Sequence, residues 1–360
     1  MSRPFVFAQA FAFLAVALTA AAQTYTITDL GVLKGNNESS GFWLNNLGQV
    51  VGCSDVQTVQ GYPCTGTQPG QHAFLWSKAT GMLDLGTLPG GNISGGVGIN
   101  DSGAVVGYSN NAAMPALDYV AFVWSADSGM VNLGTLPQGT SSAAFQINSS
   151  GVIVGDSFKS TGLVAPTTWT DGKIRNLGMI ANSVFDAGLG INNNGQVVGE
   201  SVFSYGPPFL SHAFTWKSGA GMRDLGTLPG GVTSSANAIN SAGTAVGQSD
   251  GTATGGLWHA VLWDTAKKIH DLGTLAGGTY SIAFGINDSN QIVGYGNLAN
   301  NAPHAMIWTA GAGMQDLNTM ISGGSGWVLI NANAINSVRQ ITGYGAKNGH
   351  NHAFLLTPKN

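Results

Sequence analysis

The chain has 360 residues and a formal net charge of −4, with 17 acidic residues against 13 basic ones. Only 8% of the residues are charged, against about 25% in an ordinary soluble domain, and 54 are glycine. These figures exclude a long-helix or coiled-coil protein, and a hydrophobic content of 43% excludes a charge-rich disordered chain. The scattered positive residues also exclude the basic surface of a nucleic-acid-binding protein.

Residues 1–22 have the pattern of a secretory signal peptide. Arg3 precedes an apolar stretch from Phe5 to Leu18, and Ala20 and Ala22 fit a small-residue cleavage site. The alternative is a membrane anchor that stays attached, but the apolar stretch is shorter than the ~20 residues of a membrane span. We therefore expect an exported protein that starts near Gln23, in the periplasm, the cell envelope or the medium, with no transmembrane segment in the mature chain.

Seven copies of one unit fill residues 23–360, and their three landmarks recur at intervals of 44–55 residues. The first landmark is Ile-Asn (Leu-Asn in the first copy), followed by a polar turn and a Val-Val-Gly segment. Its asparagines are Asn45, Asn100, Asn148, Asn192, Asn240, Asn287 and Asn336. The second is a His-Ala-Phe-Leu-Trp strand, which in six copies ends in Trp76, Trp124, Trp169, Trp216, Trp263 and Trp308. The third is Asp-Leu-Gly, with Asn132 and Asn176 replacing the aspartate in two copies and Asp316 followed by Leu-Asn in another.

Each unit carries four strand signals, because its β-branched and aromatic runs are bounded by Gly, Asn, Ser and Asp. Four antiparallel strands in each of seven units of about 48 residues predict a seven-bladed β-propeller, as one domain over residues 23–360. A solenoid is the alternative, but its repeats are usually shorter and nothing marks polar end caps. Small residues before Ile-Asn suit the innermost strand, where the blades converge: Gly98, Gly190, Ala238, Gly285 and Ala334.

The turn after Ile-Asn has a mechanism in the sequence. In Asn100-Asp101-Ser102-Gly103 the Asn and Asp side chains can bond their own backbone, and the glycine takes a positive φ. The seventh unit has Arg339 in place of that glycine, so we expect its turn to differ. The second and third units lack the His of the second landmark, so we expect irregular blades there.

The two ends of the mature chain predict how the propeller closes. It opens with a lone strand that contains Asp-Leu-Gly, Tyr25–Gly31, which corresponds to the fourth strand of a unit. It ends with a lone strand that begins with His-Ala-Phe, His352–Leu356, which corresponds to the third strand of a unit. The strand count balances only if the N-terminal strand completes the last blade, which removes open sheet edges.

A histidine and an aspartate recur together twelve residues apart. The pairs are His72/Asp84, His212/Asp224, His259/Asp271 and His304/Asp316, and closure leaves His352 to pair with Asp29. The units that lack the His also lack the Asp, which suggests contact between the two. Repeating histidines also resemble metal ligands or general bases, but one per blade spreads them around the ring, so we interpret the pairs as structural and predict no metal and no cofactor.

Cys53 and Cys64 are the only cysteines, and they lie eleven residues apart. An even count, a short separation and an exported chain favour one disulfide that closes a local loop, and two free thiols are the alternative.

These motifs resemble the bacterial extracellular HAF-repeat family over nearly all of the mature chain. The name-giving tripeptide stands at His72-Ala73-Phe74, His212-Ala213-Phe214 and His352-Ala353-Phe354, and Asn194-Gly-Gln-Val-Val-Gly199 also fits the family pattern. The resemblance implies export and a propeller-like repeat, and it carries no catalytic residues over to this chain.

Binding residues are expected on the face that holds the longer connections, because variable loops on a rigid scaffold usually carry function. Aromatic residues that break the repeat there are candidates for stacking on a sugar or gripping a peptide, although packing of loops onto blades is the alternative. They are Tyr62, Tyr205, Phe209, Trp258 and Trp327. We therefore expect a non-enzymatic, monomeric binding or scaffold protein that recognises a glycan, a peptide or a surface protein.

The alternative function is a polysaccharide hydrolase or lyase. Asp156 and Glu200 follow the strand glycine in neighbouring units, and a glycosidase needs two carboxylates about 5–9.5 Å apart. A purely structural envelope protein is a third reading. Whether the chain is an enzyme therefore stays open at this point.

Overall fold

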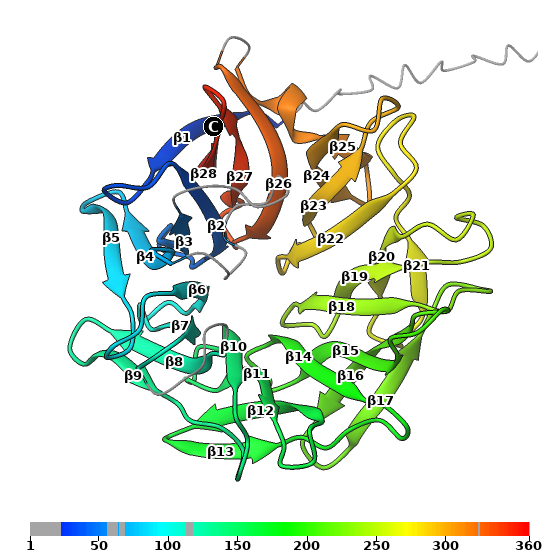
Figure 1. Ribbon diagram of the computed structural model, residues 1–360. Coiled ribbons are helices and arrows are strands. Elements are labelled where there is room, and N and C mark those ends of the chain that lie inside the picture. The colour runs from blue at the N-terminus through cyan, green and yellow to red at the C-terminus, as the bar shows by residue number, and fades with distance from the viewer. Residues whose placement is uncertain (1–22, 56–63, 65–68, 113–117, 323–324, 360) are drawn as a thin grey trace, which may run out of the picture.

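The structure is a computed structural model that describes residues 23–55, 64, 69–112, 118–322 and 325–359. All of its regular elements are β-strands apart from one short 3₁₀ helix, η1, at Leu317–Met320. The strands form four-stranded antiparallel sheets around a common axis (Figure 1). The expectation of an all-β protein built from such sheets is confirmed.

Consecutive strands build each sheet from the axis outward. Three sheets are formed by β2 (Glu38–Leu44), β3 (Val50–Asp55), β4 (His72–Ser77) and β5 (Gly81–Gly86); by β6 (Ser94–Ile99), β7 (Val105–Ser109), β8 (Val120–Ser125) and β9 (Gly129–Asn132); and by β18 (Ser234–Ile239), β19 (Ala245–Ser249), β20 (His259–Trp263) and β21 (Ile269–Asp271). A fourth is formed by β22 (Ser281–Ile286), β23 (Ile292–Asn297), β24 (Pro303–Thr309) and β25 (Gly313–Asp316).

Two further groups of four strands are joined by a single parallel pairing, Val164 with Phe185. Their strands are β10 (Ser142–Ile147), β11 (Ile153–Phe158), β12 (Val164–Thr170), β13 (Lys173–Asn176), β14 (Phe185–Ile191), β15 (Val197–Ser204), β16 (Leu210–Lys217) and β17 (Gly221–Gly226). The second and third units keep four strands each although they lack the histidine, and what sets them apart is the parallel pairing at the junction after the third unit.

The remaining sheet joins the two ends of the described chain. Its order is β1 (Tyr25–Gly31), β28 (His350–Pro358), β27 (Ile341–Lys347) and β26 (Trp327–Ile335). β1 pairs with β28 in antiparallel register from Tyr25 opposite Pro358 to Gly31 opposite Ala353. The backbone N–H of Lys359 also donates to the carbonyl of Thr24 at 2.8 Å. The N-terminal strand is thus the outer strand of this sheet.

The turn after each innermost strand follows one pattern. In the second sheet the Asn100 side chain accepts from the backbone N–H of Ser102 and Ala104, and Gly103 has a φ of 82°. Arg339 adopts the same left-handed conformation, with a φ of 66°, and its N–H bonds to the Asn336 carbonyl as in the other turns. The expectation of a different seventh turn is wrong, because the asparagine's hydrogen bonds hold the turn despite the side chain at that position.

A circle of hydrogen bonds joins the innermost strands at their ends. The side-chain N–H₂ of each repeat asparagine donates to the carbonyl of the next one at 2.9–3.3 Å, from Asn45 to Asn100 and onward around the axis. The last asparagine, Asn336, donates to Asn45 at 3.0 Å. Each asparagine therefore stabilises its own turn through its oxygen and the neighbouring sheet through its nitrogen.

Side chains from facing sheets form the core. Val51, for example, packs with Phe122 of the next sheet, and Val154 packs with Phe214. The innermost strands approach closely, since a Cβ on Gly98 would lie 2.8 Å from the carbonyl oxygen of Phe145. The small residue before Ile-Asn is therefore needed at that junction.

One hydrogen bond recurs at most junctions between sheets and is missing between β12 and β14. In five junctions the serine at the start of the innermost strand accepts the backbone N–H of the alanine near the start of the previous sheet's third strand, as Ser94 does from Ala73 at 2.9 Å. Between β12 and β14 that alanine is Pro166, which has no N–H, and that serine is Asp186. Asp186 is fully buried, and its Oδ1 lacks an ordinary hydrogen bond.

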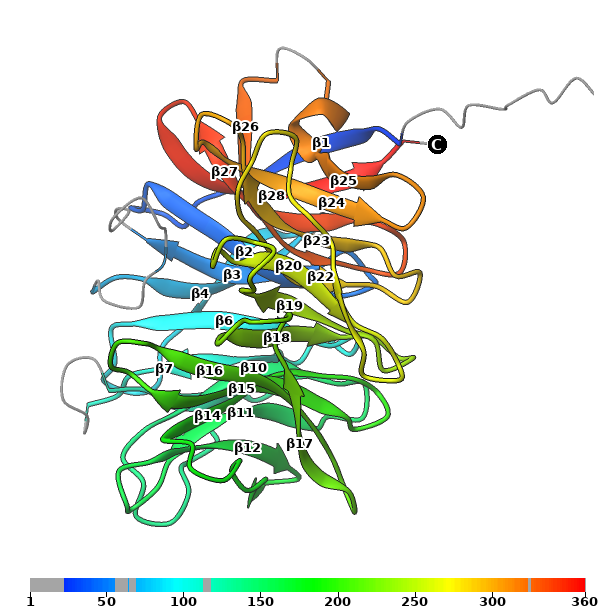
Figure 2. The same cartoon turned by 90° about the vertical axis from the view of Figure 1, so that its right-hand side faces the viewer.

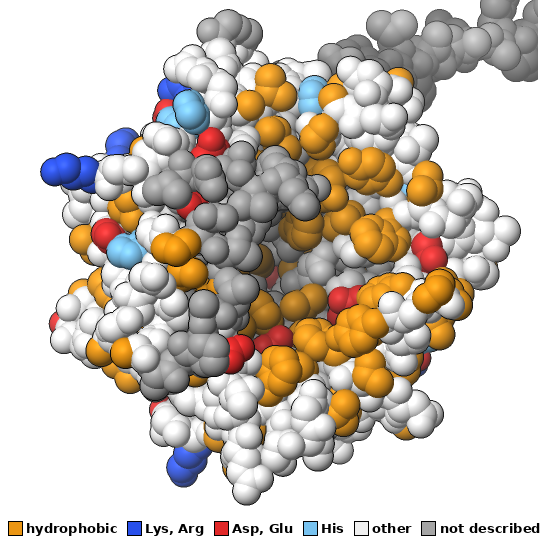
Figure 3. Space-filling model, in the orientation of Figure 1, with side chains coloured by type: hydrophobic (Ala, Val, Ile, Leu, Met, Phe, Trp, Pro, Cys, Tyr) orange, Lys and Arg blue, Asp and Glu red, His pale blue; other side chains and the backbone are white. Residues whose placement is uncertain are grey.

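The connections lie on two opposite faces of the ring (Figure 2). The tight turns that follow the first and third strands of each sheet share one face. The other face, called the loop face from here on, carries the connections after the second and fourth strands and faces the viewer in Figures 1 and 3. Among the described residues there is no helix with the length and apolarity to cross a membrane.

Candidate functional site

A bulge in each innermost strand points one side chain at the axis. The strand registers shift two residues before the Ile-Asn pair, for example between Gly96 and Gly98 and between Ala283 and Gly285. A bulge leaves one residue outside the ladder and redirects its side chain. These bulge residues are Phe42, Val97, Phe145, Leu189, Asn237, Phe284 and Asn333.

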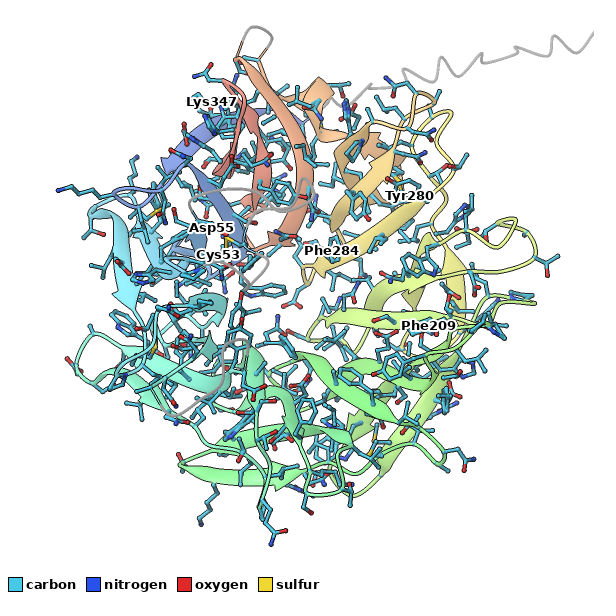
Figure 4. All side chains as sticks on the ribbon, in the orientation of Figure 1. Cys53, Asp55, Phe209, Tyr280, Phe284 and Lys347 are labelled. Atoms are coloured by element: carbon cyan, nitrogen blue, oxygen red, sulfur yellow. A yellow bond between two sulfur atoms is a disulfide. The ribbon has the colours of Figure 1, made fainter. Side chains whose placement is uncertain are left out.

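The bulge residues line a cavity of about 310 Å³, here called the axial cavity, together with Trp43, Tyr108 and Gln146. Figure 3 shows hydrophobic side chains gathered around the central hollow of the loop face, with acidic side chains at its lower edge. Phe284 lies at the inner end of β22, whereas Phe209 lies farther out on the ring (Figure 4). The lining is thus an apolar arc interrupted by three amides.

Trp43 separates the axial cavity from a second space below it. It occupies the position before Ile-Asn where five other units have Gly or Ala, and it packs against hydrophobic clusters on different sides of the axis, one containing Leu44, one Ile99 and one Ile286. It also lines the lower cavity of about 190 Å³, which is surrounded by the circle of asparagines. The indole is therefore the floor of the axial cavity.

The three amides of the lining are engaged within the protein. Asn237 donates to the carbonyl of Ala283 at 2.8 Å, and Asn333 donates to that of Gly41 at 2.8 Å. The oxygen of Gln146 accepts the backbone N–H of Ile191 at 2.8 Å. These amides therefore brace neighbouring sheets and leave the cavity with little hydrogen-bonding capacity for a ligand.

A second layer of side chains surrounds the axial cavity toward the loop face, formed by the residue that follows the strand glycine. In β7 this residue is Tyr108, whose ring covers Gly95 and lines the cavity, and burial raises the pKa of its hydroxyl to about 12. In β23 it is Tyr295, whose ring stacks on Phe284 with centroids 5.8 Å apart. This position therefore reaches the cavity wall in both sheets.

Asp156 and Glu200 occupy the same position in β11 and β15. Burial raises the pKa of Asp156 to about 7, against a partly offsetting hydrogen bond from the backbone of Ala143. Burial also raises the pKa of Glu200, which a hydrogen bond from Ser211 partly offsets. Both carboxylates are therefore poorly solvated in their charged form.

The structure does not bring these two acids together as a catalytic pair. Alternate residues of a strand share a face, so Asp156 lies on the same face as Val154, which packs against the sheet of β14–β17. By the same alternation Glu200 shares the face of Val198, which packs against the sheet of β18–β21. The two acids therefore lie on opposite sides of the intervening sheet, which does not suit an acid/base pair on one sugar.

The predicted aromatic residues have different environments. Tyr205 is 66% exposed and Phe209 is 38% exposed, with ring centroids 6.3 Å apart. Trp258 is 43% exposed and donates its indole N–H to Thr233 at 2.9 Å. Tyr62 lies outside the described residues.

Trp327 is not an exposed aromatic residue. It is 9% exposed, its ring packs edge-on against Phe354 and His352, and the Lys347 ammonium lies 5.4 Å from its centroid. The expectation of an exposed ligand platform is wrong here, because β26 begins at Trp327 and turns the side chain into the core between sheets.

Each predicted histidine lies beside its aspartate. The Nδ1 to carboxylate distance is 3.0 Å in His72/Asp84, 2.7 Å in His212/Asp224, 3.0 Å in His259/Asp271, 2.7 Å in His304/Asp316 and 3.0 Å in His352/Asp29. The hydrogen bond between His72 and Asp84 raises the pKa of the histidine and lowers that of the aspartate. Each pair lies within one sheet, so the pairs do not converge on one site.

The aspartate of each pair also supports the backbone. Asp84 accepts the N–H of Gly86 at 2.7 Å, and Asn132 and Asn176 make the same bond in the units without the histidine. Asparagine therefore keeps the backbone role where no imidazole needs a partner. Within the described ranges no group of three or more His, Cys, Asp or Glu side chains is placed to hold a metal ion.

Cys53 and Cys64 form a disulfide, as predicted. Cys53 is fully buried in β3, at the position that carries Tyr108 in the next sheet (Figure 4). The bond therefore ties a loop-face connection to a strand near the axis.

Sequence reasoning missed the bulge residues and Trp43, which form the cavity. Strict alternation along the innermost strand places the residue two before Ile-Asn on a sheet face, and only the bulge turns it to the axis. One available signal was Trp43 itself, which stands where most other units have Gly or Ala.

The fold is a β-propeller, and comparison with solved structures agrees. The chain is similar to YCF48 bound to D1 peptide, with a TM-score of 0.51, 10% identity and coverage of 94% of this chain and 96% of that one. It is similar to the puromycin hydrolase S511A mutant complexed with PGG, with a TM-score of 0.51, 14% identity and coverage of 88% and 50%. TolB from Acinetobacter baumannii gives a TM-score of 0.45 at 13% identity, with coverage of 87% and 80%. No family model and no curated protein matches the sequence.

Proposed function

We propose that this chain is an exported, non-enzymatic binding protein that holds its ligand in the axial cavity of the loop face. The observation that carries the proposal is the cavity itself, a concave apolar space of about 310 Å³ lined by bulge residues. Concave, mostly apolar spaces with a few fixed polar groups are the usual form of a ligand site. YCF48, a propeller of similar extent, is bound to D1 peptide, and this supports a peptide as the kind of ligand.

The scaffold proposed for this function is one domain of seven blades, closed by the N-terminal strand. Three observations support it: the recurring four-stranded units, the pairing of β1 with β28, and the hydrogen bond from Asn336 back to Asn45. A closed ring would fix the distances between bulge residues around the axis, so that the cavity keeps its shape without a ligand.

Export is supported by the signal-peptide pattern of residues 1–22 and by the Cys53–Cys64 disulfide, because disulfides persist in oxidising compartments. The repeated His-Ala-Phe and Asp-Leu-Gly motifs support membership of the HAF-repeat family, and we include that membership in the proposal.

The enzymatic alternative has no supporting geometry, since Asp156 and Glu200 face different neighbouring sheets. A screen of the mature protein on glycan and peptide arrays tests the choice. Binding to a defined class of ligand without turnover is the expected result. Cleavage of a bound polysaccharide that stops in the Asp156→Asn/Glu200→Gln variant would overturn the proposal, as would the absence of any binding.

A further inference from the structure

The axial cavity selects against sugars and favours an apolar side chain. Its wall is formed largely by Phe42, Phe145, Leu189 and Phe284, and its floor by Trp43. The side-chain amides of Asn237 and Asn333 already donate hydrogen bonds to backbone carbonyls of the next sheets. A sugar placed here would leave hydroxyl groups without partners, which costs about 1–3 kcal/mol for each buried group. An aromatic or branched aliphatic group has no such cost.

The second layer adds negative charge on one side of the cavity. Asp156 lies opposite Ala143 in the strand register, and Glu200 lies opposite Ala187. Both alanines stand two residues before a bulge residue, Phe145 or Leu189. The two acids thus occupy the second layer in the neighbouring sheets that supply Phe145 and Leu189 to the wall, and neither carboxylate is itself part of the cavity lining.

Neither carboxylate has a basic partner among the described ion pairs. Lys159, the nearest base along the chain to Asp156, contacts the sulfur of Met179 at 3.6 Å, and its charge lowers the pKa of Asp186. The burial that raises the pKa of Asp156 and of Glu200 is therefore not offset by a cation of the protein. A cation from a ligand would supply that missing interaction.

An exposed aromatic ring lies close to one of these acids. Burial and, to a smaller extent, the charge of Glu200 raise the pKa of Tyr205, so the phenol lies within electrostatic range of the carboxylate. Tyr205 is 66% exposed, with Phe209 beside it. A carboxylate and a nearby aromatic face both favour a positively charged group, the aromatic face by cation–π attraction.

These observations lead to one ligand class. We infer that the axial cavity binds a peptide segment in which an apolar side chain stands next to a lysine or arginine, the apolar group entering over Trp43 and the cation meeting the carboxylate of Asp156 or of Glu200. The inference rests on the proposed function and adds the chemistry of the ligand to it.

Fluorescently labelled nonapeptides with serine-glycine flanks and a central Phe-Arg, Phe-Gln, Phe-Glu or Ala-Arg test the inference. Their Kd values for the mature protein are measured by anisotropy at low salt and at pH 8, above the pKa of about 7 at Asp156. We expect the Phe-Arg peptide to bind at least tenfold more tightly than the Phe-Gln and Ala-Arg peptides, and the Phe-Glu peptide to bind most weakly. A rise to high salt is expected to remove most of the preference for arginine over glutamine.

Two variants with the same charge change locate the effect. Asp156→Asn/Glu200→Gln is expected to equalise the Kd values of the Phe-Arg and Phe-Gln peptides, whereas Asp127→Asn/Asp171→Asn, exposed on the opposite face, is expected to leave them unchanged. If the first variant does not fold, the salt dependence of peptide binding to the unaltered protein tests the inference instead. The expected result is the loss of most of the preference for Phe-Arg over Phe-Gln at high salt.

Equal affinity for the Phe-Arg and Phe-Glu peptides would overturn the inference, and so would an equal effect of the two variants. If the arrays show binding of glycans alone, the inference fails while the proposed binding function stands. If no probe of any class binds, the proposed function fails as well.

Discussion

The Nδ1 of His352 lies 3.0 Å from Oδ1 of Asp29, although 323 residues separate the two in the chain. Burial raises the pKa of Asp29, but hydrogen bonds from Lys347, the backbone of Gly31 and His352 outweigh it, so the pKa is lowered overall. Four other sheets make the same pairing between residues twelve apart, and this contact makes it between the first and last strands.

We therefore expect Asp29→Ala to destabilise the protein about as much as Asp84→Ala. Hydrogen bonds to charged groups contribute about 1.5–3 kcal/mol, and partial exposure brings the expected loss to about 1–2 kcal/mol. Urea unfolding of both variants measures it, with the exposed Asp127→Ala as a control. A neutral Asp29→Ala beside a destabilised Asp84→Ala would contradict the pairing of the chain ends.

The His72/Asp84 pair predicts a maximum in its contribution to stability at mildly acidic pH. The pKa of His72 is raised from 6.5, so its contribution is complete below pH 6.5 and is lost as the pH rises through the folded value. The pKa of Asp84 is lowered from 3.8, so its contribution is present above that value and is lost as the pH falls further. The Tm difference between the unaltered protein and Asp84→Asn should be largest near pH 5 and smaller at pH 8. A difference that grows steadily toward pH 8 would be inconsistent with this pair.

The junction between β12 and β14 offers a stabilising change. Restoring the repeat with Pro166→Ala/Asp186→Ser supplies the missing N–H and a hydroxyl, and it removes a buried carboxylate whose pKa is raised by burial. We expect a gain of about 1–3 kcal/mol at pH 7. The gain should shrink toward pH 4, because a raised carboxylate pKa costs stability only where the unfolded chain is ionised. Thermal melts at both pH values check this, and an equal or larger gain at pH 4 would argue against the carboxylate as the cause.

Trp43→Ala should remove the floor between the two axial spaces. Truncation of a large core aromatic residue costs about 3–5 kcal/mol when it is fully buried, and we expect about 3 kcal/mol for this half-buried ring. Guanidinium unfolding measures the loss, with Leu47→Ala, at a 71% exposed position, as the control. A loss below about 1 kcal/mol would mean that the indole does not pack across the axis.

The sequence predicted the repeat, the four-stranded sheets and the partner of Asp29 because these follow from spacing. Twelve residues between His72 and Asp84 leave room for one hairpin, and the orphan strands at the two ends have only each other to pair with. The Cys53–Cys64 disulfide was predictable for the same reason.

The axial cavity was not predictable from the sequence, because it depends on seven β-bulges that no local residue pattern indicates. A bulge inserts one residue into a strand, so Phe145 or Phe284 reads as an ordinary core position until the register with the neighbouring strand is known. The prediction for Trp327 was wrong because its place in a loop-like segment of the sequence suggested an exposed side chain. In the structure β26 begins at this residue, and the side chain is buried. The turn at Arg339 shows that hydrogen bonds accepted by Asn336 can impose a conformation that the arginine itself disfavours.

The proximity of Thr24 to Lys359 makes the position of the chain ends arbitrary with respect to the architecture. A short linker between them, with new termini opened in the exposed turn near Asp127, would leave every sheet with its four strands. Such a circular permutant would carry its last sheet as four consecutive strands and would depend for closure on a different sheet.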